Sequence, residues 1–169
     1  MEIIMNNTHE YLVNTRFPEF SLLNDNGKIV SNAQLDGKWN VIFFYPKDES
    51  PGCTIQSCSF RDKIPEFDAL GVQIFGISSD SVSSHKNFKK KYNLQYSLLS
   101  DKGGKLVKSL KLKKDFGLLR ARVTLVVNPE GDITFVHTSQ LGVTGHVKKA
   151  LEEIRSKKID SETSSSIRY

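Results

Sequence analysis

Residues 43–62 read FFYPKDESPGCTIQSCSFRD and contain a strand end, a turn and a helix start. The continuous apolar run within residues 40–45 predicts a strand that is covered on both faces of a sheet. The turn that follows contains Pro and Gly, so Cys53 falls in the first turn of a helix. Unpaired amide groups and the positive end of the helix dipole favour an anion at that position. We therefore expect Cys53 to be a thiolate nucleophile that needs no adjacent histidine.

Apolar and amphipathic segments alternate along the rest of the chain, as they do in α/β proteins. Pro65 interrupts the helix that follows Cys53, so we expect a kink or a restart there, and Gly71 ends the segment. The expected strands are 20–23, 28–31, 40–45, 72–77, 96–99, 123–127 and 132–137, with hairpin turns at 24–27 and 128–131; the expected helices are 54–71, 81–92, 102–110 and 144–155. This order predicts an α/β sandwich in which helices flank a central mixed β-sheet.

Length and composition favour one globular domain. The chain has 169 residues, of which 38% are hydrophobic and 25% charged, enough for one core and too few for two ordinary domains. We expect a loose N-terminal extension at residues 1–14, a single domain at 15–155, and a polar, disordered C-terminal tail at 156–169. No apolar run approaches the roughly 18 residues of a membrane span, and the first residues lack a signal-peptide pattern. These features predict a cytoplasmic protein.

Positive charge is concentrated between Lys86 and Lys114. This stretch holds ten lysines and one acidic residue, Asp101, which makes it +9 in a chain of formal charge +5. The lysines alternate with apolar residues, which is typical of solvated helix faces. No zinc-finger spacing, arginine-rich arm or aromatic RNA-binding pattern accompanies them, so we do not expect nucleic acid binding. An electrostatic surface for an acidic partner is the alternative interpretation.

Cys58 follows Cys53 by five residues in the same expected helix. In an intact helix this spacing separates the two Cα atoms by roughly 8 to 9 Å. A disulfide tolerates only about 4.4 to 6.8 Å, so the two residues can be linked only if the turn unwinds. The spacing suits a reaction in which Cys53 becomes a sulfenic acid and Cys58 condenses with it. An inert buried thiol is the alternative interpretation of Cys58.

The sequence shows no metal-binding spacing. The two cysteines do not form a Cys-x-x-Cys pair, and zinc-finger spacing is absent. The histidines are far apart along the chain, and we interpret them as surface or capping residues; they are His9, His85, His137 and His146. We therefore expect neither a metal nor another cofactor.

The run at 43–62 closely resembles the peroxidatic signature of the peroxiredoxins, and its Cys-x4-Cys spacing is similar to the bacterioferritin comigratory, or Q-type, subfamily. FGISSDSVSSHKNFKKKYNLQYSLLSD at residues 75–101 and RVTLVVNPEG at 122–131 also resemble that family. The resemblance covers residues 16–155. It implies a thioredoxin-like fold of the peroxiredoxin type.

The family's Pro-x-x-x-Thr/Ser-x-x-Cys motif matches Pro46, Ser50 and Cys53. The resemblance implies that Cys53 attacks the peroxide, that Ser50 donates a hydrogen bond to it, and that Pro46 shields the pocket. The family's arginine matches Arg122, which would stabilise the thiolate and bind the peroxide. Arg120 is two residues away, but Arg122 fits the Arg-x-Thr/Ser pattern that precedes the strand.

The resemblance also implies a reaction and its partners. Cys58 would resolve the sulfenic acid of Cys53 into an intramolecular disulfide, which thioredoxin or a similar dithiol protein would reduce. The expected substrates are hydrogen peroxide and small organic hydroperoxides, and the expected assembly is a monomer or a weak homodimer. A peroxide sensor or thiol-disulfide exchange protein that passes oxidation to a partner is the alternative.

Overall fold

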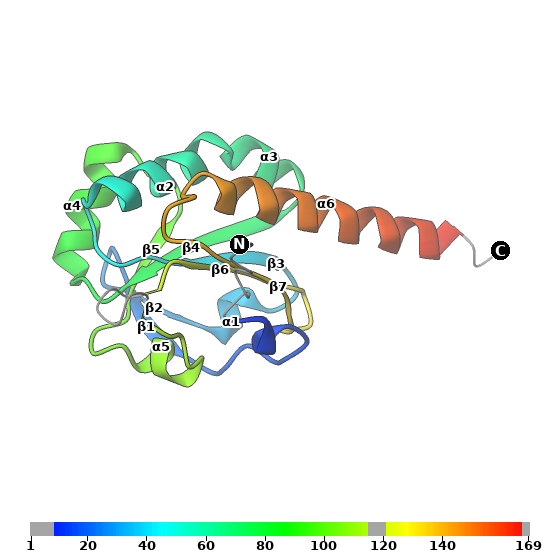
Figure 1. The fold of residues 1–169 in the computed structure, drawn as a ribbon, viewed down its shortest axis with the longest axis horizontal. Coiled ribbons are helices and arrows are strands. Elements are labelled where there is room, and N and C mark those ends of the chain that lie inside the picture. Colours follow the sequence, from blue (N-terminus) through cyan, green and yellow to red (C-terminus); the bar gives the residue numbers. More distant parts are fainter. Residues whose placement is uncertain (1–8, 115–120, 167–169) are drawn as a thin grey trace, which may run out of the picture.

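The computed structural model describes residues 9–114 and 121–166, and it arranges them around one central sheet (Figure 1). The strands are β1 (Ser21–Asn24), β2 (Ile29–Ser31), β3 (Trp39–Phe44), β4 (Val72–Ser78), β5 (Ser97–Ser100), β6 (Val123–Val127) and β7 (Ile133–Thr138). They form a seven-stranded sheet in the order β2-β1-β5-β4-β3-β6-β7. The pairs β3·β4 and β4·β5 are parallel, and the other pairs are antiparallel. The mixed sheet predicted from the sequence is therefore confirmed.

Helices cover both faces of this sheet. They are η1 (Glu10–Leu12), α1 (Asn32–Leu35), α2 (Pro51–Asp62), α3 (Ile64–Ala69), α4 (Val82–Tyr92), α5 (Lys105–Ser109) and α6 (Gly145–Ser166). One apolar cluster joins alternate residues of β3 to α2, α3, α4 and α6, and a second cluster joins the other residues of β3 to η1, α1 and α5. Figure 1 shows α2, α3 and α6 on one side of the sheet and α1 and α5 on the other. The alternation along β3 produces the two cores because successive side chains of a strand point to opposite faces.

The segment that carries the cysteines has the predicted break. α2 begins at Pro51, where a missing amide hydrogen costs nothing, and ends at Asp62. Lys63 separates α2 from α3, in which Pro65 occupies the first turn. The helix expected at 54–71 is thus two helices, with Cys53 in the first turn of α2.

Two features differ from the expectations at the chain ends. Residues 9–14 are not loose, because Leu12 is buried in the core and the amide of Asn14 donates to the Ile133 carbonyl at 2.8 Å. At the other end α6 continues to Ser166, whereas the sequence predicted a helix end at residue 155 and a disordered tail. Residues 1–8 and 167–169 lie outside the described residues, so the predicted domain limits stay a prediction.

α1 is an element that the sequence interpretation missed. Ser31 and Gln34 form a capping box, in which the Gln34 side chain accepts a hydrogen bond from the Ser31 amide at 2.7 Å. The Ser-x-x-Gln spacing is a recognised signal for a helix start. The helix is only four residues long, too short for hydrophobic periodicity to reveal it.

Candidate active site

Cys53 lies at the third position of α2, and its side chain is completely buried. Ser50 precedes the helix as its N-cap residue, and its carbonyl accepts the first helical hydrogen bond, from the Thr54 amide at 2.9 Å. The amides of Gly52 and Cys53 therefore precede the helical hydrogen-bond ladder. The buried sulfur sits at the end of α2 where backbone donors favour a negative charge.

Arg122 lies directly before β6 and is 5% exposed. A Cβ atom added to Gly52 would meet the Arg122 Nη2 atom at 3.1 Å, so the guanidinium lies against the residue that precedes Cys53. Its Nη1 atom donates to the Gln56 Oε1 atom at 2.6 Å. The structure thus brings a permanent cation to the first turn of α2. The sequence rival, Arg120, lies outside the described residues.

Two further predicted site residues, Ser50 and Pro46, lie in the loop between β3 and α2. Ser50 is half-buried, and its hydroxyl donates to the Lys47 carbonyl at 2.9 Å instead of capping α2. The oxygen of this hydroxyl retains lone pairs that can accept a further hydrogen bond. Pro46 is half-buried in the same loop. Their predicted contacts with a peroxide stay predictions.

A group of buried polar atoms near Cys53 has no hydrogen-bond partner among the described residues. These atoms are Thr54 Oγ1, Gln56 Nε2, Ser57 Oγ and Arg122 Nε. Three belong to α2, and the fourth belongs to the arginine that contacts this helix. Buried polar groups are usually paired, so each of these atoms keeps an unused capacity for a hydrogen bond.

Cys58 lies in α2 and is partly exposed, and both cysteines are free thiols. The helix is continuous from Pro51 to Asp62, so the first part of α2 must unwind before the two sulfurs can bond. The last turn of α2, beyond the cysteines, is tightly packed, because Phe60 stacks on Phe43 with ring centroids 4.4 Å apart.

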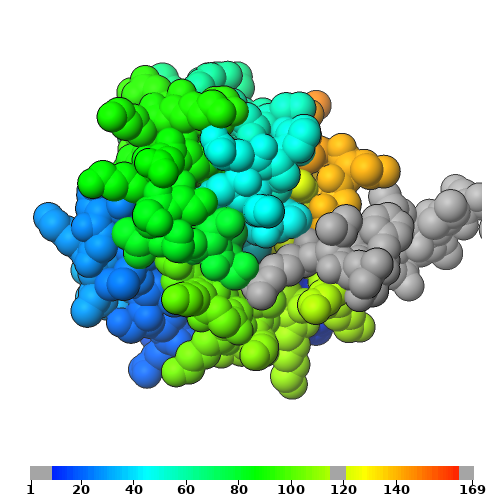
Figure 2. Space-filling view, turned by 90° about the vertical axis from the view of Figure 1, so that its left-hand side faces the viewer, coloured from blue at the N-terminus to red at the C-terminus, as the bar shows by residue number. Residues whose placement is uncertain are grey.

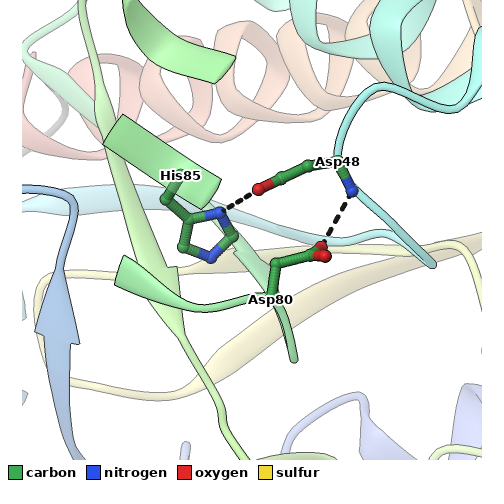
Figure 3. Close-up of side chains that lie close together, drawn as sticks. All are labelled: Asp48, Asp80 and His85. Atoms are coloured by element: carbon green, nitrogen blue, oxygen red, sulfur yellow. Dashed lines mark hydrogen bonds and ion pairs between the residues drawn. The ribbon is translucent and has the colours of Figure 1, made fainter. Parts of the chain in front are cut away.

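A second polar cluster surrounds the loop before α2 (Figure 3). The candidate ligand atoms of Asp48, Asp80 and His85 lie within 4.8 Å of one another, a spacing that could hold a metal ion. The Asp48 carboxylate and the His85 ring nitrogens are nevertheless already engaged in hydrogen bonds within the protein. Asp80 Oδ2 likewise accepts from the Asp48 amide and the Ser78 hydroxyl. The arrangement is thus a closed hydrogen-bond network rather than an open ligand set.

A third cluster fixes the start of α6 to the sheet. His146 Nε2 donates to the Ser139 carbonyl at 2.8 Å, so its Nδ1 accepts from the Thr124 hydroxyl at 2.8 Å. Burial lowers the pKa of His146 to about 4, and the charges of His137 and Arg122 act in the same direction. His146 is therefore a neutral side chain that connects α6, β6 and the segment after β7.

The interpretation of the histidines as surface or capping residues is wrong for His85 and His146, and His9, although it is the N-cap residue of η1, does not lie at the surface. His9, His85 and His146 are fully buried, and His137 is partly buried. Each fully buried ring is hydrogen-bonded, which offsets the cost of removing its nitrogens from water.

The lysine-rich stretch lies on the molecular face that also carries the start of α2. Figure 2 shows the green segment of α4 beside the cyan segment that begins α2, with the yellow-green segment of α5 lower on the same face. Exposed lysines on these two helices and next to them include Lys86, Lys90, Lys102, Lys105 and Lys108. Acidic partners lie close to two others, since Lys91 pairs with Glu49 at 3.1 Å and Lys89 with Asp25 at 3.3 Å.

Two parts of this site were not predicted from the sequence, namely the contact of Gln56 with Arg122 and the hydrogen-bond network of Asp48. Gln56 is three residues after Cys53 and thus shares its helix face, a spacing that could have identified it. The partners of Asp48 come from α4 and from the end of β4, and no local pattern links residues 48 and 85.

Comparison with known families gives a match over most of the chain. The model of the AhpC/TSA family matches residues 13–136. A chloroplastic peroxiredoxin Q of Suaeda salsa is 43% identical over 140 residues, which are 82% of this chain and 65% of that protein. A chloroplastic peroxiredoxin Q of Sedum lineare is 42% identical over 142 residues, which are 83% of this chain and 76% of that protein.

Solved structures give the same result. Peroxidoxin BcpB of Mycobacterium tuberculosis superposes with a TM-score of 0.78 at 29% identity, covering 85% of this chain and 96% of that one. Peroxiredoxin Q of Xanthomonas campestris superposes with a TM-score of 0.74 at 33% identity, covering 81% of this chain and 90% of that one. The predicted thioredoxin-like peroxiredoxin fold is therefore confirmed.

Proposed function

The chain belongs to the AhpC/TSA family, with peroxiredoxin Q proteins among its relatives, and we propose that it is a thiol-dependent peroxidase. The observation that carries this proposal is the placement of Cys53. Its buried sulfur lies in the first turn of α2, and the Arg122 guanidinium lies against the preceding residue. The helix end and the guanidinium both favour a thiolate, which is the reactive form of cysteine.

The first step oxidises Cys53 and reduces the peroxide. The thiolate attacks one peroxide oxygen, a sulfur–oxygen bond forms, and the O–O bond breaks to release hydroxide or an alkoxide that takes up a proton. Cys53 becomes a sulfenic acid. Arg122 and the amides at the start of α2 stabilise the departing oxygen, and Pro46 and Ser50 form the neighbouring wall. Hydrogen peroxide and small organic hydroperoxides are the proposed substrates.

The second step forms a disulfide. The first part of α2 unwinds, the Cys58 thiol attacks the Cys53 sulfenic acid, and water leaves as the sulfur–sulfur bond forms. Thioredoxin or a similar dithiol protein then reduces this bond by thiol-disulfide exchange. The partial exposure of Cys58 supports this role, because an attacking partner needs access to one of the two sulfurs.

The lysines beside the start of α2 supply the proposed contact with the reductant. If an acidic dithiol protein docks there, raising the salt concentration should slow the reduction step and leave peroxide oxidation of Cys53 nearly unchanged. A monomer or weak homodimer and a cytoplasmic location stay predictions; the two plant relatives are named as chloroplastic proteins. No helix in the described part of the chain has the length and apolarity of a membrane span.

Sustained turnover separates a peroxidase from a sensor that passes oxidation to a partner. We expect the protein to consume many equivalents of hydrogen peroxide when thioredoxin, its reductase and NADPH are in excess. The Cys53→Ser variant should consume none above background. A single equivalent of oxidation followed by mixed disulfides with other proteins would favour the sensor.

The Cys58→Ser variant tests the second step alone. It should react once with peroxide and then accumulate sulfenic or overoxidised Cys53, because the resolving thiol is absent. Mass spectrometry of the oxidised variant provides the measurement. Unchanged recycling of this variant by thioredoxin would refute the assignment of Cys58.

A further inference from the structure

The loop that joins β3 to α2 is held to the rest of the molecule by hydrogen bonds of Asp48. These hydrogen bonds suggest that the reaction of Cys53 also depends on how firmly this loop is held. The Asp48 carboxylate is buried and accepts hydrogen bonds from the Tyr45 hydroxyl at 2.7 Å and the Ser84 hydroxyl at 2.8 Å. It also contacts the His85 Nδ1 atom at 2.8 Å. The Asp48 amide donates to the Asp80 Oδ2 atom at 2.8 Å (Figure 3). We refer to Asp48 and these four partners as the Asp48 clamp.

His85 connects Asp48 to the sheet as well as to α4. Its Nε2 atom lies 3.0 Å from the Leu99 carbonyl, which can only accept, so Nε2 carries a hydrogen. Its Nδ1 atom makes the contact with the Asp48 carboxylate, and both side chains are buried. Breaking these hydrogen bonds would leave polar groups unpaired away from water, so the loop is firmly held.

The next residue, Glu49, adds evidence that the clamp sets the path of the chain into α2. Its φ of +62° lies in the left-handed region, which is uncommon for a residue other than glycine. Such backbone conformations persist where the surroundings fix them. The clamp holds the residue before Glu49, and the Glu49 carboxylate pairs with Lys91 of α4 at 3.1 Å. Ser50 and the start of α2 follow directly.

A second fixed point lies beyond the cysteines. The Tyr96 hydroxyl donates to the Ser57 carbonyl at 2.7 Å, and Phe60 is fully buried against Phe43. The segment between the two fixed points contains Cys53 and ends close to Cys58. Unwinding of this segment therefore does not require movement of the loop that carries Pro46 and Ser50.

We propose that Asp48 is a positioning residue for the reaction of Cys53. The clamp fixes the loop of residues 46–50 on α4. Pro46 and Ser50, which form one wall of the site, therefore stay in place while the peroxide is attacked. The clamp also confines the unwinding of α2 to the turn that carries Cys53. This inference rests on the proposed peroxidase function. It assigns a role to Asp48 and His85, neither of which touches the reacting sulfur.

The first experiment compares Asp48→Asn with a matched control, Asp25→Asn. Asp25 is also buried and pairs with a lysine of α4, but it lies between β1 and β2, away from Cys53. Stopped-flow kinetics on folded protein would give the rate of Cys53 oxidation by hydrogen peroxide and the rate of disulfide formation separately. For Asp48→Asn we expect about tenfold slower oxidation, with disulfide formation unchanged or faster.

The control should stay within about twofold of the wild type in both steps. Equal oxidation rates in Asp48→Asn and Asp25→Asn would overturn the proposal, as would equal slowing of both steps in Asp48→Asn. Ser84→Ala removes a single donor and provides a second test if Asp48→Asn does not fold. It should slow oxidation by about two- to fivefold, and an unchanged oxidation rate would count against the clamp.

The second experiment does not depend on peroxide. The Cys53–Cys58 disulfide is formed with diamide, and amide hydrogen exchange is compared with that of the reduced protein. The Asp48 amide should keep its protection, while the amides of residues 54–57 should exchange at least about tenfold faster. If the Asp48 amide loses its protection from exchange together with the amides of α2, the proposed role of the clamp is wrong. If the wild type does not react with peroxide, the proposed peroxidase function is wrong. The exchange experiment would still test the role of the clamp in that case.

Discussion

The side chain of Gln56 is the hydrogen-bond acceptor for the buried guanidinium of Arg122. Its Oε1 atom accepts from Arg122 Nη1 at 2.6 Å, whereas Arg122 Nε has no partner among the described residues. Replacing Gln56 with leucine would remove this acceptor and leave more of a buried cation unpaired. We expect a loss of about 2 kcal/mol in the free energy of unfolding and about tenfold slower oxidation of Cys53.

Urea denaturation and stopped-flow oxidation measure the two effects of Gln56→Leu. Gln56→Glu restores an acceptor and should recover most of the oxidation rate. Ser59→Ala, a change at a partly exposed position of the same helix, is the control and should alter neither quantity. Wild-type oxidation kinetics in Gln56→Leu would show that the contact with Arg122 is not needed for the reaction.

Individual residues show what a sequence can and cannot reveal about this site. Cys53 and Arg122 were predicted from a local motif and its resemblance to a family, and the structure brings both to the first turn of α2. The fully buried positions of His85 and His146 could not be predicted in the same way. Their partners come from other elements, 37 residues away for His85 and 22 residues away for His146. Only the tertiary fold creates these pairs.

At the scale of elements, the junction between α6 and β6 should respond to pH through His146. The unfolded chain takes up a proton near the ordinary pKa of 6.5, but burial lowers the pKa of the folded His146 to about 4. The stability that the neutral ring provides is therefore complete above pH 6.5 and is lost as the pH falls toward 4. The difference corresponds to about 3 kcal/mol.

The His146→Gln variant isolates this effect from the titration of other groups. Chemical denaturation at several pH values between 7 and 4 should show wild-type stability falling more steeply than that of the variant. The gap between the two proteins should narrow by about 3 kcal/mol over this interval. Parallel pH profiles would mean that His146 does not titrate differently in the folded state.

Element boundaries were predictable where the chain carries a local signal. The Ser81 hydroxyl accepts a hydrogen bond from the Ser84 amide and begins α4 as expected, and Pro65 coincides with the break between α2 and α3. The extent of α6 was not predictable, because residues 156–163 are mostly polar and largely exposed. Polar composition predicted disorder there, but the helix continues to Ser166.

At the scale of the whole molecule, only the first part of α6 contributes to the core. Val147, Leu151 and Ile154 are buried, whereas the helix beyond them extends away from the body of the protein (Figure 1). Removing residues 160–169 should therefore change the melting temperature by less than about 2 °C. Ile154→Ala should instead cost about 2 to 5 kcal/mol, because it leaves a cavity in the core.

Thermal unfolding of the truncated chain, followed by circular dichroism, checks this division of α6. A decrease in melting temperature as large as that caused by Ile154→Ala would mean that the removed end of the chain makes stabilising contacts. The truncated protein should also retain the peroxide reactivity of the full chain, because the start of α2 and the Asp48 clamp lie at the other end of the fold.

The central claim is that peroxide oxidises Cys53 and that Cys58 then bonds to it. The most direct test is to treat the fully reduced protein with one equivalent of hydrogen peroxide, alkylate the remaining thiols, and map both cysteines by mass spectrometry. We predict complete loss of alkylation at both positions and a single Cys53–Cys58 linked peptide. Two fully alkylated cysteines, with the peroxide still present in solution, would contradict the account.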